Sequence, residues 1–224
     1  RMVGALMRLA ILVAILLVRV AHAEPPTFAI DLRAKEALAD KVATPLEEAF
    51  RKLGSAKTAE YRSKGTKKDR VAASTDDCPN ARTAECAVVI GTKLGVDFIF
   101  AGWVERKNTK FLLELDMFSV HSGKRVRSIR DYAPPNVDPK KWALSVFTRI
   151  VDTSTGSLQI SSNAQRATVF VDGQRVTELY QGRALVTGLV LGRHAIELRA
   201  AGYKTYVDEV VVDGTTPINV LLQP

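Results

Sequence analysis

The sequence predicts an α+β protein whose amino-terminal part is a mixed sheet with helices on one face, followed by a small all-β sandwich. Between residues 27 and 151, segments with strand-like alternation are interspersed with segments of helical periodicity. Between residues 156 and 224, short β-prone runs alternate with turn signals. Because 46% of the 224 residues are hydrophobic, each part has enough apolar side chains for a core.

The first part begins with a strand and an amphipathic helix. Every second residue of 27–32 is apolar, and residues 36–53 carry apolar side chains at helical spacing. Gly54 follows this helix as a C-terminal cap, and Pro45 inside it predicts a kink. The basic stretch 55–76 has no clear periodicity, and we expect a polar loop that contains at most a short helix.

A second helix, three strands and a third helix follow. Residues 79–94 predict a helix with Pro79 in its first turn, and residues 97–106 a strand that is apolar on both faces and therefore central. Residues 111–120 and 125–132 predict two more strands, the second more polar and suited to an edge. Residues 138–151 predict the last helix, which completes an α+β layer arrangement.

The second part, residues 156–224, contains seven short β-prone runs after a linker at residues 152–156. Asp172-Gly173 is a strong hairpin signal, and Asp213-Gly214 marks another turn. The predicted strands are 157–161, 167–171, 174–176, 184–190, 194–200, 206–212 and 218–222. This pattern is typical of a small β-sandwich.

Residues 1–23 have the features of a secretory signal peptide. Arg8 precedes ten apolar residues, 9–18, and Ala21-His22-Ala23 has the small-x-small pattern that precedes a cleavage point. Ten helical residues span about 15 Å, roughly half of a bilayer's hydrocarbon core. We therefore expect cleavage after Ala23 and a periplasmic or cell-surface product with no stable membrane span.

The alternative is an uncleaved anchor over residues 3–20, which Arg8 and Arg19 would bracket or interrupt. The expected cleavage point has no cysteine, so a lipid-anchored product is not expected. No later segment is apolar enough to span a bilayer.

The net charge of +8 includes three leader arginines and no leader acid, which leaves +5 for the exported part. Part of the excess lies in one run: Arg62, Lys64, Lys67, Lys68 and Arg70. Such a run fits either a solvated loop or a contact with phosphate or an anionic surface. Because exported proteins rarely meet DNA, we expect no nucleic-acid partner.

Cys78 and Cys86 are the only cysteines, and an oxidising compartment favours their pairing. The closed loop is short, so the expected stabilisation is about 2–3 kcal/mol. The bridge requires the segment around Cys78 to fold back onto the helix that carries Cys86. A metal site or a catalytic thiol would need further ligands or a base nearby, and the sequence has none there.

The run from Cys86 to Val104 contains Lys93-Leu94-Gly95-Val96-Asp97 between a predicted helix and a predicted strand. It resembles the amino-terminal domain of TolB and the related domain of the curli secretion channel. That family commonly has Asp and Thr before the glycine of the later turn, where this chain has Ser119 and Ser122. The resemblance covers about 100 residues. It implies a binding or assembly module and brings no catalytic residues.

The second part resembles the PEGA domain. The motifs that carry the resemblance are Gly156-Ser157-Leu158-Gln159-Ile160, Ala167-Thr168-Val169-Phe170-Val171-Asp172-Gly173, Gly188-Leu189, Gly192-Arg193-His194-Ala195-Ile196-Glu197-Leu198, Ala201-Gly202-Tyr203, Glu209-Val210-Val211-Val212 and Val220-Leu221-Leu222. The family usually has a Gly-x-Thr-Pro loop where this chain has Thr177–Leu185. The resemblance implies a non-catalytic, surface-associated module appended to other exported domains.

The sequence contains no constellation typical of catalysis. The exported part has two histidines, His121 and His194, and neither has a second His or Cys at metal-ligand spacing. Asp76-Asp77 is typical of a solvated turn, and there is no nucleophile elbow or phosphate loop. We therefore expect no enzyme, no cofactor and no metal.

Three tyrosines are the candidate ligand contacts: Tyr180, Tyr203 and Tyr206. They lie in or near predicted loops of the second part, where their rings can stack on a sugar or a peptide. The alternative is that they serve cross-strand packing.

The sequence thus predicts a non-catalytic exported binding or scaffold protein of the bacterial cell envelope. Its expected partner is an envelope protein or a cell-wall or surface polysaccharide. The alternative is an assembly component of an outer-membrane secretion or transport machine. An enzyme is a third hypothesis, and it would require a deep polar pocket with converging ionisable groups.

Overall fold

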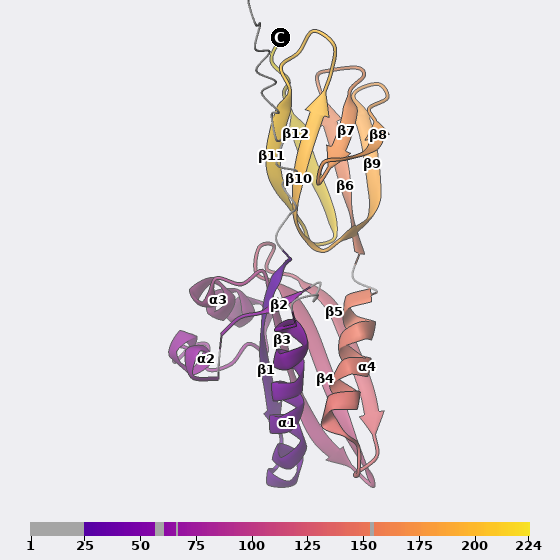
Figure 1. Ribbon diagram of the computed structural model, residues 1–224. Coiled ribbons are helices and arrows are strands. Elements are labelled where there is room, and N and C mark those ends of the chain that lie inside the picture. Colours follow the sequence, from indigo (N-terminus) through magenta and orange to yellow (C-terminus); the bar gives the residue numbers. More distant parts are fainter. Residues whose placement is uncertain (1–24, 57–60, 66, 153–154) are drawn as a thin grey trace, which may run out of the picture.

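The computed structural model describes residues 25–56, 61–65, 67–152 and 155–224, so the predicted signal peptide lies outside the described residues. The chain forms an α+β part and a β-sandwich that stand end to end (Figure 1). No helix in the described ranges is both long and apolar enough to cross a membrane.

The amino-terminal part is a five-stranded mixed sheet in the order β2-β1-β3-β4-β5. Its elements are β1 (Thr27–Ala34), α1 (Ala37–Gly54), β2 (Arg62–Ser63), α2 (Lys67–Ala73), α3 (Ala84–Leu94), β3 (Phe98–Lys107), β4 (Lys110–Ser119), β5 (Arg125–Ala133) and α4 (Pro139–Asp152). β1 runs parallel to β2 and β3, and the other pairs are antiparallel. The central position predicted for β3 and the edge position predicted for β5 are confirmed.

The main core lies between one face of this sheet and the helices α1 and α4. The sheet contributes alternate residues to it, among them Phe28, Ile30, Leu32, Phe98, Phe100, Leu113, Leu115 and Met117. Because side chains alternate between the two faces of a strand, the residues between these face the other way.

The structure differs from the one-face expectation in the position of α3, which packs on the opposite face (Figure 1). There Ala87 and Ile90 of α3 meet Ala29, Ile99 and Ala101 of the sheet. Strands β1 and β3 carry apolar side chains on both faces because α1 and α4 cover one face and α3 covers part of the other.

Helix α3 begins at Ala84, so the prediction of a helix from Pro79 is wrong at its start. Thr83 is the N-cap, and its hydroxyl accepts a 3.2 Å hydrogen bond from the backbone N–H of Cys86. Cys86 therefore lies in the first turn of α3. The segment before the helix folds back, as the disulfide required.

The predicted disulfide is present. Cys78 and Cys86 are bonded, with 5.1 Å between their Cα atoms. In the loop before Cys78, the backbone N–H of Cys78 donates to the carbonyl and the hydroxyl of Thr75. The bridge therefore attaches the 75–78 turn to the start of α3.

The carboxy-terminal part is a sandwich of two sheets, in the orders β11-β10-β7-β8 and β12-β6-β9. Its strands are β6 (Thr155–Ser162), β7 (Thr168–Val171), β8 (Gln174–Glu178), β9 (Arg183–Val190), β10 (Gly192–Arg199), β11 (Tyr206–Val212) and β12 (Thr215–Val220). Both sheets contribute to its core, for example Leu158 and Ile160 from one and Ile196 and Leu198 from the other. The predicted all-β sandwich is confirmed.

Candidate functional site

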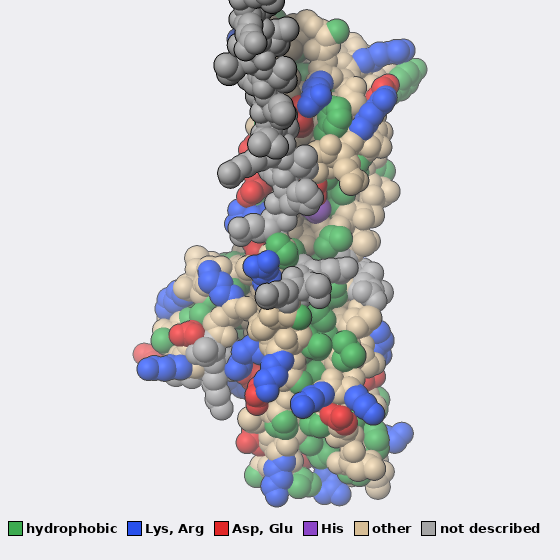
Figure 2. Space-filling view, viewed as in Figure 1, with side chains coloured by type: hydrophobic (Ala, Val, Ile, Leu, Met, Phe, Trp, Pro, Cys, Tyr) green, Lys and Arg blue, Asp and Glu red, His purple; other side chains and the backbone are tan. Residues whose placement is uncertain are grey.

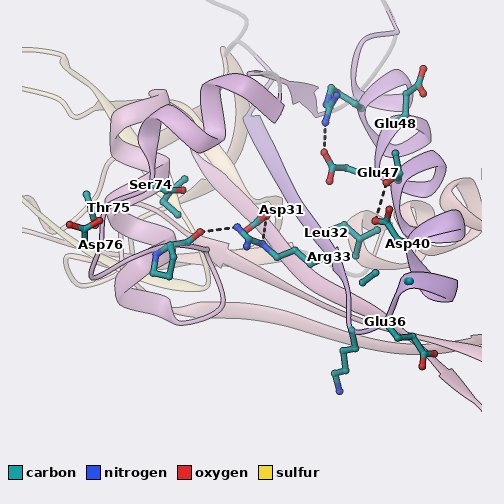
Figure 3. A pocket seen from close by; sticks show the side chains of 17 residues that line it. Asp31, Leu32, Arg33, Glu36, Asp40, Glu47, Glu48, Ser74, Thr75 and Asp76 are labelled. Atoms are coloured by element: carbon teal, nitrogen blue, oxygen red, sulfur yellow. Dashed lines mark hydrogen bonds and ion pairs between the residues drawn. The ribbon is translucent and has the colours of Figure 1, made fainter.

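A groove of about 1230 Å³ lies beside β1 (Figure 3). One wall is α1, the floor is the end of β1, and the other wall is formed by Ser74, Thr75, Asp76 and Pro79. The groove is open and polar. Its lining includes six carboxylates, Asp31, Glu36, Asp40, Glu47, Glu48 and Asp76, and three cations, Arg33, Lys35 and Arg51.

The α1 wall is a polar stripe on an amphipathic helix. Asp40, Thr44, Glu47, Glu48 and Arg51 recur at spacings that place them along one side of the helix. The neighbouring stripe of α1 enters the main core. The sequence thus gives α1 one apolar side for the sheet and one charged side for the groove.

Backbone pairing leaves part of the β1 edge open to this groove. β2 pairs only with Thr27 and Phe28. The N–H of Lys64 then donates to the carbonyl of Phe28 at 2.7 Å. Beyond Phe28, no described residue pairs with this edge of β1.

The direction of the free backbone groups follows from the parallel ladder, in which one residue directs its N–H and C=O to the same side. The N–H of Lys35 donates to the carbonyl of Val104 on β3 at 3.1 Å. Residues two and four positions before Lys35, namely Arg33 and Asp31, share its direction. The residues that alternate with them, Ile30, Leu32 and Ala34, therefore direct their N–H and C=O groups away from β3. Leu32 and Ala34 line the groove.

Asp31 and Arg33 fix the wall opposite α1. The carboxylate of Asp31 is buried and accepts hydrogen bonds from the N–H of Ala81 at 3.0 Å and from Nε of Arg33 at 3.1 Å. Nη2 of Arg33 donates to the carbonyl of Pro79 at 2.8 Å. Together with the disulfide, these bonds hold the 74–81 segment beside β1 (Figure 3).

The groove's carboxylates differ in how they are neutralised. Glu47 is buried and paired with Arg51 four residues on. The hydrogen bond and the charge of Lys52 lower the pKa of the exposed Glu48. The remaining rim carboxylates, Glu36, Asp40 and Asp76, form no ion pair with any described residue.

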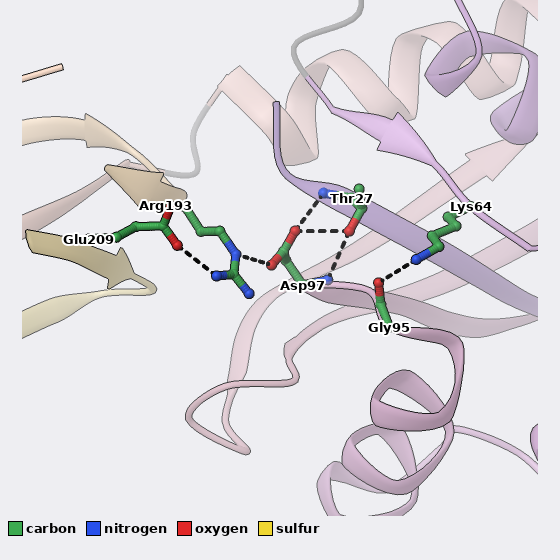
Figure 4. Close-up of polar contacts among 6 residues, drawn as sticks. All are labelled: Thr27, Lys64, Gly95, Asp97, Arg193 and Glu209. Atoms are coloured by element: carbon green, nitrogen blue, oxygen red, sulfur yellow. Dashed lines mark hydrogen bonds and ion pairs between the residues drawn. The ribbon is translucent and has the colours of Figure 1, made fainter. Parts of the chain in front are cut away.

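A second polar cluster joins the two parts of the chain (Figure 4). Oδ2 of Asp97 accepts hydrogen bonds from the N–H and the hydroxyl of Thr27, both at 2.8 Å. Its Oδ1 accepts from Nε of Arg193 at 3.2 Å, and Nη1 of Arg193 donates to Glu209 at 2.7 Å. The bonds to Glu209 and then Asp97 raise the pKa of Arg193.

Apolar contacts reinforce this junction. Leu191 and Val212 come from the sandwich, but both are buried in the core cluster of the amino-terminal part. Tyr61 belongs to the same cluster, and its hydroxyl donates to the carbonyl of Leu191 at 3.4 Å. Ser119 donates to Asp213 at 2.8 Å. The two parts are therefore packed against each other instead of being joined only by the chain.

The three candidate tyrosines lie at the end of the sandwich remote from this junction. Tyr180 follows β8, Tyr203 follows β10, and Tyr206 begins β11. The antiparallel order β11-β10-β7-β8 brings these three strand ends to the same end of the sheet, with β8 and β11 at its opposite edges. Tyr180 is 67% exposed and Tyr203 is 36% exposed. Their ligand role stays a prediction.

The two histidines take different positions. His194 is buried, with Nδ1 2.7 Å from Asp172 and Nε2 2.7 Å from the carbonyl of Val190. His121 lies exposed in a turn. No group of three or more metal-ligating side chains occurs among the described residues. On the face that Figure 2 shows, Lys and Arg side chains are spread over the amino-terminal part instead of forming one patch.

Residues 155–224 match the family model of the PEGA domain. They form a PEGA domain. This confirms the resemblance seen in the sequence, and it assigns the sandwich strands β6–β12 to that family. No curated protein matches the sequence of the chain.

Several solved structures are similar to this chain. The LpoB C-terminal domain from Salmonella enterica is 12% identical, with a TM-score of 0.38 over 49% of this chain and 83% of that one. PelC from Paraburkholderia phytofirmans, solved as a dodecamer, is 11% identical, with a TM-score of 0.35 over 57% of this chain and 84% of that one. TolB from Acinetobacter baumannii is 10% identical, with a TM-score of 0.35; the match covers 82% of this chain and 38% of the TolB chain.

Proposed function

We propose that this is a non-catalytic exported binding or scaffold protein of the bacterial cell envelope, and that the groove beside β1 is its binding site. The observation that carries the proposal is the groove itself, which is walled by α1 and by a segment held through Asp31, Arg33 and the disulfide. Concave surfaces with convergent polar groups are where binding sites are expected, and the two walls give the groove a fixed shape.

Export is supported by the leader at residues 1–23 and by the disulfide. A Cys78–Cys86 bridge persists in an oxidising compartment such as the periplasm or the cell surface. The PEGA domain gives the chain a second module, which the Asp97–Arg193 junction holds in place. Cleavage after Ala23 stays a prediction, and mass spectrometry of the purified mature chain tests it.

A binding role, in place of catalysis, is supported by the chemistry of the groove. Its two most buried carboxylates, Asp31 and Glu47, are engaged by Arg33 and Arg51, and Asp31 also holds the 74–81 segment through the N–H of Ala81. The rim presents the exposed carboxylates of Glu36, Asp40 and Asp76, which suit the recognition of a charged partner.

Crosslinking in cells tests the proposal. A benzoylphenylalanine replaces Thr44, an exposed groove position, in the full chain, and a control replaces Leu144, which is 52% exposed on α4. We expect a discrete crosslinked partner from position 44 and none from position 144. No crosslink from position 44 in the envelope fraction, or recovery of the chain in the cytoplasm, contradicts the proposal. A partner that is an outer-membrane complex favours the assembly-component alternative.

A further inference from the structure

The free edge of β1 has unsatisfied backbone groups of a defined kind. Ile30, Leu32 and Ala34 each direct one N–H and one C=O away from β3, and none has a described partner there. A row of unpaired N–H and C=O groups is a template for another strand. Extended peptides bind to such edges through main-chain hydrogen bonds, and pockets for alternate side chains give specificity.

The groove gives this edge the shape of a slot for one strand. The stretch from Ile30 to Ala34 spans about 17 Å, which is enough for a short strand pairing. An incoming strand would lie between α1 and the 74–79 segment (Figure 3). Since side chains alternate along a strand, one set would meet the polar stripe of α1 and the other set the opposite wall.

The charge of the slot indicates the chemistry of its occupant. Carboxylates outnumber cations in the lining, although the chain as a whole carries +8. Glu36 and Asp40 lie on the α1 side and Asp76 lies on the opposite wall, all exposed and without an ion pair to a described residue. A segment with Lys or Arg side chains complements both walls.

A second copy of the chain fits this slot less well. Pairing of β1 with the β1 of another copy would bring the same carboxylates of α1 close to each other. Like charges brought together across an interface disfavour association. The charge therefore favours a different protein as the occupant.

We infer that the groove binds an extended, Lys- or Arg-bearing segment of a partner protein, which adds as a strand to the free edge of β1 at Leu32 and Ala34. This inference rests on the proposed function, since it names the partner chemistry of the same site. It specifies backbone pairing, which a simple acidic surface contact does not require.

Ala34→Pro tests the backbone pairing, with Ala34→Ser as the matched control. Proline removes the outward N–H, and edge strands tolerate it where the N–H faces away from the sheet. Arg33, which precedes this position, lies in a strand, and the residue before a proline prefers such an extended backbone. Serine keeps the N–H. Peptides are selected from a random phage-displayed library on the full wild-type chain and then measured on both variants.

We expect the selected peptides to be enriched in Lys and Arg. We also expect about a tenfold loss of affinity in A34P and little change in A34S, as the loss of one good hydrogen bond would give. Selection of no binder, or equal affinity of A34P and A34S, overturns strand addition. Thermal melting shows whether both variants are folded.

Amide hydrogen exchange supplies a readout that does not depend on a variant. On addition of the tightest selected peptide to the wild-type chain, the N–H groups of Leu32 and Ala34 should exchange at least tenfold more slowly. The peptide with its Lys and Arg replaced by Glu should not bind. Unchanged exchange at both residues overturns the inference even if A34P does not fold.

The rim carboxylates are tested by Asp40→Asn combined with Asp76→Asn. We expect a two- to tenfold loss of affinity for the selected peptide, because each exposed ion pair contributes little. Equal affinity contradicts the charge assignment. A partner that crosslinks from position 44 equally well in A34P leaves the proposed function standing and removes strand addition.

Discussion

Asp97 and Arg193 are 96 residues apart in the chain but meet across the junction, with Nε of Arg193 3.2 Å from Oδ1 of Asp97. The Asp97 side chain is only 15% exposed, and it also holds Thr27 at the start of β1. The pair therefore connects the PEGA domain to the strand whose other end forms the groove.

Arg193→Ala should lower the free energy of unfolding by about 0.5–1 kcal/mol, because the arginine is half exposed and screened. Asp97→Ala should cost about 2 kcal/mol, since it also leaves the N–H and hydroxyl of Thr27 without their acceptor. Urea unfolding of both single variants and the double variant gives the coupling energy.

The matched control for this cycle is Arg175→Ala. Arg175 pairs with Glu178 on one hairpin, and both side chains are about 60% exposed. We expect a change close to zero. Equal losses for Arg193→Ala and Arg175→Ala, with no coupling to Asp97, would show that the junction pair does not hold the two parts together.

The raised pKa of Tyr206 predicts that the chain loses stability at alkaline pH. Burial, with the hydrogen bond that its hydroxyl donates to Asp208 at 2.7 Å, raises the pKa of Tyr206 from 10.0 to about 12. Between these pH values the folded state keeps a proton that the unfolded state has lost. Stability should therefore fall as the pH rises through this window.

The absorbance of tyrosinate during an alkaline titration tests this. The tyrosinate absorbance of wild type minus that of Tyr206→Phe should show a step near pH 12. Asp208→Ala should move the step to lower pH, because it removes the hydrogen bond. A wild-type step already at pH 10 contradicts the prediction.

Gly102 is required by the close approach of β3 and β4. A Cβ at this position would lie 2.0 Å from the carbonyl oxygen of Glu114 and 3.0 Å from Cα of Leu115. Both atoms are backbone of a paired strand and cannot rotate away. Gly102→Ala should cost about 3 kcal/mol or more in unfolding free energy, measured by urea denaturation.

Gly202→Ala is the control for this substitution. Nothing lies within 4 Å of its Cβ position, but its φ of 79° is strained for any other residue. We expect a loss of about 1 kcal/mol from the backbone alone. A loss at Gly102 no larger than that at Gly202 would contradict the steric explanation.

The sequence predicted most strands because each one alternates or is bounded by a turn residue. Asp172-Gly173, for instance, takes positive φ at both residues, as the hairpin signal required. The start of α3 was predicted wrongly because Pro79 fits a loop as well as a first helical turn. The N-cap at Thr83 places the start of the helix at Ala84. β2 has two residues, too few for any periodicity.

The groove could not be predicted because it depends on β2, which is too short to leave a pattern in the sequence. Its floor exists because β2 ends after pairing with Phe28, and a two-residue strand in a basic stretch leaves no signal. The polar stripe of α1 was visible in the sequence, but it is typical of any solvated helix face. Only the register of β1 against β3 shows that Leu32 and Ala34 direct free backbone groups into this space.

The disulfide should stabilise the wall of the groove as well as the chain. Reduction, or Cys78→Ser combined with Cys86→Ser, should lower the unfolding free energy by about 2–3 kcal/mol, since the bridge closes a loop with a sequence separation of 8. Urea unfolding with and without a reductant measures this. The double-serine variant must show no dependence on the reductant.

Because Arg33 reaches the carbonyl of Pro79 next to Cys78, the loss should also be local. Amide exchange at Ala81, whose N–H donates to Asp31, should accelerate in the double-serine variant, whereas exchange in the remote strand β10 of the PEGA domain should follow only the global loss of stability. Equal acceleration at both places would mean that the bridge stabilises the whole chain without holding the wall. Peptide affinity should fall in parallel with the local opening, since a strand bound on the β1 edge needs both walls.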